Sequence, residues 1–337
     1  MANNELAPQA LPSAWRAEQG TVELMDIGHA SLNEPFFGDS IMALRRSGAA
    51  TVTRLALTSL RDLLAMENVG PPTGFIFHVG RCGSTLLANM IGAHPAVRAV
   101  KEPPVISAFL ARTGLGRGSG NANDDILRTL IAAFGRGLHG EYFVVKFTGW
   151  TAVDIERILG LFPATPAVFL WRPAIEVITS WMARMPTWAE VGKRSQLART
   201  LNIVDRQRMA GEHGLISYFS HVWLAEASAA YDVARRPRSR VTTVTYADLR
   251  DNPKGVILAV SGHFRIPVSL NEVPLMAAQA DRYSKDQSGK TKHDSQGKHF
   301  RPSLRDDQRA VVEEITGQLE LNLERLTYER GLRCQSD

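Results

Sequence analysis

The stretch that decides the fold is FIFHVGRCGSTLLANM, residues 75–90. Its first five residues are mostly apolar, as in a buried strand, and residues 86–90 read as part of a helix. The turn between them, GRCGST at residues 80–85, contains two glycines. Glycine lets a backbone approach an anion closely, and the first N–H groups of a helix point toward such an anion. A strand, this turn and a helix start therefore predict a cradle for a phosphate group.

Polar side chains of the turn fit the same purpose. Ser84 and Thr85 add hydroxyl donors, and Arg81 adds a charge that is never lost. The turn departs from the nucleoside triphosphate loop GxxxxGK[ST], because Gly83 stands where that pattern has lysine. The alternative is an ordinary strand-to-helix turn with a serine cap.

Apolar runs of strand length alternate with helical patterns along the rest of the chain. Strands are expected at residues 74–79, 143–147, 167–170 and 241–246, and helices at residues 84–93, 174–184 and 221–235. This alternation predicts an α/β fold of three layers, in which helices cover both faces of a mostly parallel central sheet. Ligands of such folds bind beyond the carboxyl ends of the strands.

The chain divides at Gly70-Pro71-Pro72. Residues 1–70 are predicted to form a helical N-terminal extension, with apolar residues at helical spacing in 39–47 and 50–66. Residues 71–337 are predicted to form the main domain.

Composition narrows the class of protein. The 337 residues are 44% apolar and carry a net charge of +5, which suits an anionic ligand without indicating nucleic acid. The start of the chain lacks the pattern of an export signal, and no run of 18 apolar residues predicts a membrane span, so we expect a cytoplasmic protein. The two cysteines, Cys82 and Cys334, predict neither a disulfide scaffold nor a structural zinc site. Oligomeric state is left open.

Two further cations end apolar runs. Arg172 follows a predicted strand, and Ser180 lies two helical turns later, off the apolar face, where both groups can bind one anion. A salt-bridged arginine and a solvated serine are the alternative. Lys146 also ends a predicted strand, and a buried ammonium group needs an anion. For this lysine the alternative is a salt bridge to Asp154 or Glu156.

At this point a family resemblance becomes specific. VGRCGSTLL at residues 79–87, followed by AHPAVR at 93–98, resembles the 5′-phosphosulfate loop of the P-loop sulfotransferases, especially their carbohydrate and tyrosylprotein branches. The resemblance implies a P-loop NTPase-like fold and 3′-phosphoadenosine 5′-phosphosulfate (PAPS) as sulfuryl donor. It implies that the loop residues bind the donor: Gly80, Arg81, Cys82, Gly83, Ser84 and Thr85. In that family the backbone and hydroxyl groups hold the 5′-phosphate and the basic residue faces the sulfuryl group.

RPAIEVITS at residues 172–180 resembles the 3′-phosphate motif of the same family, with Arg172 and Ser180 at the family's spacing. Relatives usually have one residue between the arginine and the proline, whereas Pro173 follows Arg172 directly. Because ATP has no 3′-phosphate, the two motifs together favour PAPS.

The resemblance also implies catalytic roles. Glu102 matches the family's catalytic glutamate in position and is expected to be the general base. Lys146 matches its catalytic lysine and is expected, with Arg81, to stabilise the bridging oxygen in the transition state. An exposed loop glutamate beside Lys101 is the alternative for Glu102, and His78 or Lys101 would be the next candidates for the base.

The sequence is less specific about a metal ion and about the acceptor molecule. Because a sulfuryl group carries less negative charge than a phosphoryl group, fixed cations suffice and no metal is expected. The acceptor is expected to carry a hydroxyl group, in a carbohydrate, phenol, lipid or peptide, bound by variable loops at residues 113–125 and 186–197. A basic loop at residues 284–298 is a candidate cover for the 3′-phosphate, through Lys285, Lys290 or Lys292.

Two other functions remain open. One is a P-loop kinase that uses ATP and Mg²⁺ on a small molecule, although the loop lysine and an acidic magnesium strand are missing. The other is a non-catalytic nucleotide-binding module.

Overall fold

A computed structural model describes residues 6–28, 32, 34–48, 50–114, 121–138, 141–186, 189, 211–281 and 304–331. The expected basic loop at 284–298 and Cys334 lie outside these residues. So does most of the expected acceptor loop at 186–197 and the middle of the one at 113–125.

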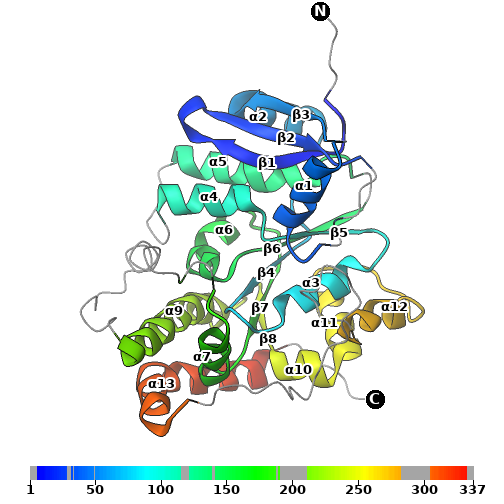
Figure 1. Cartoon of the computed structure of the whole chain (residues 1–337). Coiled ribbons are helices and arrows are strands. Elements are labelled where there is room, and N and C mark those ends of the chain that lie inside the picture. Colours follow the sequence, from blue (N-terminus) through cyan, green and yellow to red (C-terminus); the bar gives the residue numbers. More distant parts are fainter. Residues whose placement is uncertain are drawn as a thin grey trace, which may run out of the picture.

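A five-stranded parallel sheet forms the centre of the molecule (Figure 1). Its order is β5-β6-β4-β7-β8, and the phosphate-loop strand β4 lies in the middle. The strands are β4 (Gly74–His78), β5 (Val97–Lys101), β6 (Tyr142–Lys146), β7 (Ala167–Trp171) and β8 (Val241–Thr245). Strands β4 and β7 are buried at every position, as expected where helices cover both faces. The predicted fold class is confirmed, together with four of these strands; β5 was not predicted.

Helices lie on both sides of this sheet. Figure 1 shows α3, α11 and α12 on one side and α7 and α9 on the other. The predicted helices correspond to α3 (Ser84–Gly92), α7 (Ala174–Ala183) and α9 (Gly211–Ala234). The others of this part are α4 (Pro104–Thr113), α5 (Asn121–Ala132), α6 (Ile155–Leu161), α10 (Tyr246–Asp251), α11 (Pro253–His263), α12 (Val273–Ala277) and α13 (Asp306–Arg330), with short 3₁₀ turns that include η2 (Ala133–Gly135) and η3 (Gly149–Asp154).

The order of the strands determines where a ligand binds. The chain leaves β4 through the phosphate loop, and the neighbours of β4 in the sheet are β6 on one side and β7 on the other. The chain runs from β4 to β5 on one side of the sheet and from β7 to β8 on the other. Connections from the adjacent strands β4 and β7 therefore diverge at their carboxyl ends, the place where open α/β sheets bind ligands.

The N-terminal extension differs from the expected helical one. It has helices α1 (Phe37–Arg46) and α2 (Leu57–Met66), but also an antiparallel sheet of β1 (Ala10–Arg16), β2 (Thr21–Asp26) and β3 (Val52–Ala56). The start of the predicted helix at 50–66 is thus a strand. β1 was hidden by Pro12 and by a register shift between Pro12 and Ala14, because proline within a short run argues against a strand.

Buried contacts join this extension to the central part. Arg136, which is 0% exposed, donates from Nη1 to the carbonyl of Ala10 (2.8 Å) and from Nε and Nη2 to the carboxylate of Glu67 (2.8 and 2.6 Å). The ring of Phe37 meets that of Phe134 at 5.2 Å. Within the described ranges no helix is both long enough and apolar enough to cross a membrane.

Candidate active site

The phosphate loop connects β4 to α3. Arg81 and Gly83 take positive φ angles of 58° and 85°, and a side chain at position 83 would begin 2.8 Å from the ring of Tyr246. Gly83 is the N-cap of α3, and among the described residues no side chain caps this helix. The first intrahelical bond runs from the N–H of Leu87 to the carbonyl of Gly83, so the N–H groups of Ser84 and Thr85 precede it. The alternative of a serine cap is wrong, and the helix start has the form of an anion site.

Gly80 begins the loop under a tight constraint. A side chain there would begin 2.4 Å from the ring of Trp181, so only glycine fits. Its N–H donates to Oε2 of Glu226, on α9, at 3.4 Å. Glu226 is 2% exposed, and burial raises the pKa of its carboxyl well above the usual value, which favours the neutral form of the group. Sequence reasoning missed Glu226; its only sequence signal is an acid within the apolar run WLAEASAAY.

Cys82 faces the core. Its thiol donates to the carbonyl of Val79 at 2.9 Å, and burial raises the pKa of this thiol to about 12. The thiol therefore stays protonated and anchors the loop to the core. The part of Cys82 that can contact a ligand is then its backbone and not its thiol.

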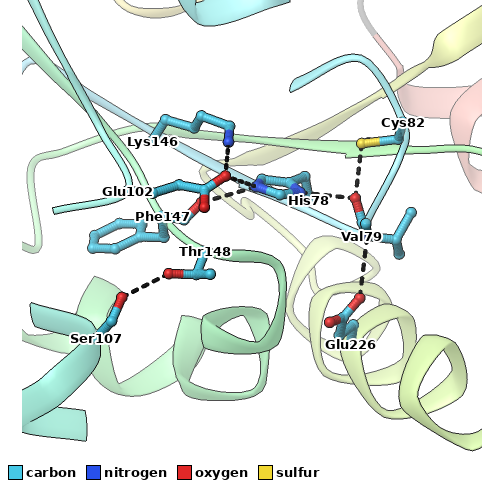
Figure 2. A network of polar contacts seen from close by, with 10 residues as sticks. His78, Val79, Cys82, Glu102, Ser107, Lys146, Phe147, Thr148 and Glu226 are labelled. Carbon is cyan, nitrogen blue, oxygen red and sulfur yellow. Dashed lines mark hydrogen bonds and ion pairs between the residues drawn. The ribbon is translucent and has the colours of Figure 1, made fainter. Parts of the chain in front are cut away.

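Glu102, Lys146 and His78 meet at the carboxyl ends of three adjacent strands (Figure 2). The Nζ of Lys146 donates to Oε1 of Glu102, and the Nε2 of His78 lies 3.8 Å from the same oxygen. The N–H of Glu102 donates to the carbonyl of Lys146 at 2.7 Å, and the φ of Glu102 is +50°. The lysine side chain is 1% exposed and the glutamate side chain 21% exposed, so the carboxylate forms the more accessible end of the pair.

This pairing answers the alternatives raised by the sequence. The partner of Lys146 is Glu102, whereas Glu156 binds Arg236 at 2.5 Å and Asp154 lies 3.9 Å from Arg157.

His78 is an uncharged neighbour of this pair. Its ring nitrogens lie 2.8 Å from the carbonyl oxygens of Val79 and Phe147. Burial and, next, the charge of Lys146 lower the pKa of His78 to about 3, despite the opposite effect of Glu102 and the two carbonyls. A neutral ring has one N–H, so His78 donates to one of the carbonyls.

Lys101 stands beside Lys146 in the register of β5 and β6. It is 3% exposed, and its ammonium donates to Oδ1 of Asn89 at 3.0 Å. Burial and then the charge of Lys146 lower the pKa of Lys101 to about 8. The ammonium of Lys101 is therefore bound to Asn89, whereas that of Lys146 is bound to Glu102.

Arg172 links the second motif to the phosphate loop. Its Nη1 donates to the carbonyl of Arg81 at 3.2 Å, and its guanidinium carbon lies 4.5 Å from the ring centre of Tyr246. The expected alternative is also present, since Nε and Nη2 donate to Oε2 of Glu176 at 2.7 and 2.5 Å. Ser180 lies half-buried on α7, two turns after Arg172.

The side chain of Arg81 extends toward the end of α7, where Nη2 donates to the carbonyl of Arg184 at 3.3 Å. Among the described residues, no group of three or more His, Cys, Asp or Glu side chains is arranged to hold a metal ion.

Comparisons with known proteins give structural matches alone, because no family model and no curated protein matches the sequence. The chain is similar to a sulfotransferase from Alicyclobacillus acidocaldarius, at 17% identity over 77% of this chain and 96% of that one, with a TM-score of 0.44. A sulfotransferase from Mycobacterium avium matches at 11% identity over 77% and 80%, with a TM-score of 0.43. A mouse sulfotransferase complexed with PAP matches at 10% identity over 82% and 96%, with a TM-score of 0.41. Matches at such identities concern the fold alone.

Proposed function

We propose that this chain is an enzyme that transfers a sulfuryl group from PAPS to a hydroxyl acceptor. The observation that carries the proposal is the convergence of three groups at one edge of the sheet: an uncapped phosphate loop, an arginine bonded to that loop, and a buried lysine–glutamate pair.

Donor binding divides between the two motifs. The amides at the start of α3, with the hydroxyl groups of Ser84 and Thr85, hold the 5′-phosphate of the donor. Arg172 and Ser180 hold its 3′-phosphate. The bond from Arg172 to the carbonyl of Arg81 supports this division, because it brings the second motif against the loop.

The chemistry falls to the pair at the ends of β5 and β6. The acceptor oxygen attacks sulfur, the bond between sulfur and the oxygen of the 5′-phosphate breaks, and the products are a sulfate ester and adenosine 3′,5′-bisphosphate. Glu102 accepts the proton of the acceptor hydroxyl. Lys146 turns from Glu102 to the departing oxygen, where Arg81 adds a second positive charge. This exchange of partners removes the positive charge of Lys146 from the carboxylate at the moment when it must take a proton.

Two measurements test the proposal. Incubation with sulfur-labelled PAPS and a panel of carbohydrate, phenol, lipid and peptide hydroxyls, followed by mass spectrometry, is expected to give an acceptor heavier by one sulfuryl group. Adenosine 3′,5′-bisphosphate is expected to raise the melting temperature more than ATP with Mg²⁺ does. A larger rise with ATP and Mg²⁺, together with transfer of phosphate from ATP to an acceptor, would replace the proposal by a kinase.

A further inference from the structure

The ion pair between Arg172 and Glu176 lies inside the site proposed for the 3′-phosphate. Both Nε and Nη2 of Arg172 donate to one carboxylate oxygen of Glu176. These two nitrogens form the edge of a guanidinium that binds phosphate with two parallel hydrogen bonds. Glu176 therefore occupies the edge of Arg172 that a phosphate would use.

The helix places this carboxylate between the two groups of the second motif. Glu176 follows Arg172 by four residues and precedes Ser180 by four, within α7 apart from Arg172 itself. Residues four apart on a helix are neighbours on one face, about 6 Å apart along its axis. This spacing makes Glu176 and Ser180 neighbours on α7, and the ion pair brings the guanidinium of Arg172 to the same place, so an anion that bridges Arg172 and Ser180 meets Glu176.

The two partners differ in their freedom to move. The side chain of Arg172 is 9% exposed and is held by the carbonyl of Arg81 and the ring of Tyr246, whereas the side chain of Glu176 is 48% exposed. An incoming dianion repels the carboxylate and attracts the guanidinium. The carboxylate is thus the group that gives way.

Other ionisable groups also act on the carboxylate of Glu176. Glu320, on α13, accepts from the N–H of Ala174 at 3.0 Å, and burial and then neighbouring carboxylates, Glu176 among them, raise its pKa. On α10, Asp251 and, more weakly, Tyr246 and Glu176 raise the pKa of Arg250. Glu176 therefore interacts with a second carboxyl group, Glu320, and with a second cation, Arg250, which is also bound to Asp251.

We propose that the carboxylate of Glu176 occupies the 3′-phosphate position in the donor-free protein and is displaced when the nucleotide binds. This inference rests on the proposed function. Because the carboxylate competes with the 3′-phosphate, it weakens the binding of both PAPS and the product that shares this phosphate. Competition at this position favours release of adenosine 3′,5′-bisphosphate after transfer.

Calorimetry on the full chain tests the inference with two nucleotides, adenosine 3′,5′-bisphosphate and adenosine 5′-phosphate. Glu176→Gln is expected to bind the bisphosphate about five- to tenfold more tightly, the effect of removing one charge about 4 Å from a phosphate in a solvated site. Binding of adenosine 5′-phosphate is expected to stay unchanged, and Glu176→Ala is expected to shift the bisphosphate in the same direction.

A matched control is Glu156→Gln, which removes the carboxylate of the exposed pair Glu156–Arg236 on α6 and is expected to change neither affinity. Adding Arg172→Ala to Glu176→Gln is expected to abolish the gain. Equal or weaker bisphosphate binding by Glu176→Gln and Glu176→Ala would overturn the inference, because it would mean that Glu176 orients Arg172. If the unaltered protein does not prefer the bisphosphate to adenosine 5′-phosphate, the 3′-phosphate assignment of the proposed function fails as well.

Discussion

Two buried cations near the phosphate loop form ion pairs with carboxylates. The pairs are Lys146 with Glu102 and Arg172 with Glu176, each with a partner that is more accessible than the cation. A buried charge without a partner is costly, so a cation needs such a carboxylate while no donor is bound. In both pairs the carboxylate is the member that solvent reaches more easily, so under the proposed function the anionic donor competes with it for the cation.

Our prediction at the scale of one residue concerns Glu102. Glu102→Gln keeps the shape of the side chain but removes the proton acceptor, so turnover is expected to fall about 10²- to 10⁴-fold. The affinity for adenosine 3′,5′-bisphosphate is expected to change little. Steady-state kinetics with the identified acceptor and calorimetry with the nucleotide separate the two effects.

Glutamine takes the positive φ of residue 102 no more easily than glutamate does, so local backbone strain is matched between the two proteins. Near-normal turnover would contradict the role of Glu102 as base. Lys101, whose pKa is lowered to about 8, would then be a better candidate than His78, whose pKa of about 3 makes it a weak base.

At the scale of elements, the sequence predicted strands where hydrophobic runs are continuous. Strands β4 and β7 are buried at every position, and their expected bounds differ from the observed ones by one residue. Strand β5 was not predicted because its five residues, VRAVK, include two cations. Lys101 is buried there through a bond to Asn89, twelve residues earlier on α3, a contact that no local pattern reveals.

Residues of the candidate site could likewise be predicted from the sequence only where a local pattern or a family motif marks them. Lys146 and Arg172 come at or just after the ends of apolar strands, where a charged residue stands out, and Glu102 was found by family resemblance. Glu176 and Glu226 lie within helices, where a single acid is ordinary. Their importance comes from what α7 and α9 pack against, which is tertiary information.

Our prediction at the scale of elements concerns the N-cap of helix α11. The Oδ1 of Asn252 accepts from the N–H of Gly255 at 2.9 Å at the start of α11, where Pro253 takes the first helical position. Asn252→Ala is expected to lower the free energy of unfolding by about 1 kcal/mol, measured by urea denaturation. Asn252→Asp retains an acceptor and is expected to restore most of that loss. Nucleotide affinity is expected to stay unchanged in both; a loss in Asn252→Ala as large as in an active-site variant would contradict a purely structural role.

At the scale of the whole molecule, the N-terminal extension reaches the pair Lys146–Glu102. The ring of Phe36, just before α1, lies 5.9 Å from the Nζ of Lys146. A side chain at Gly38 would begin 3.1 Å from Pro104, at the start of α4. Arg136 binds the extension at two further points, the carboxylate of Glu67 and the carbonyl of Ala10. The extension and the lysine–glutamate pair are therefore parts of one packed structure, in which an aromatic ring lies close enough to the lysine to interact with its charge.

The pH dependence of the free energy of unfolding tests whether Glu226 is neutral in the folded protein. Because burial raises the pKa of this carboxyl in the folded protein, the folded state holds its proton at pH values where the unfolded chain has lost it. The stability that this group contributes is complete below the unfolded pKa of 4.5 and is lost as pH rises toward the folded pKa. Glu226→Gln keeps an acceptor for the N–H of Gly80 and does not titrate.

We therefore expect the variant to gain stability relative to the unaltered protein as pH rises from 5 to 8, by at most about 1.4 kcal/mol per pH unit. Urea denaturation at each pH measures the difference. His78 acts in the opposite direction, since its lowered pKa stabilises the fold above pH 6.5 and the effect is lost as pH falls toward 3. That contribution is common to both proteins and cancels in the difference. If the Glu226→Gln difference were independent of pH over this range, Glu226 would be ionised in the folded protein, and a negative charge would lie next to the N–H of Gly80 in the phosphate loop.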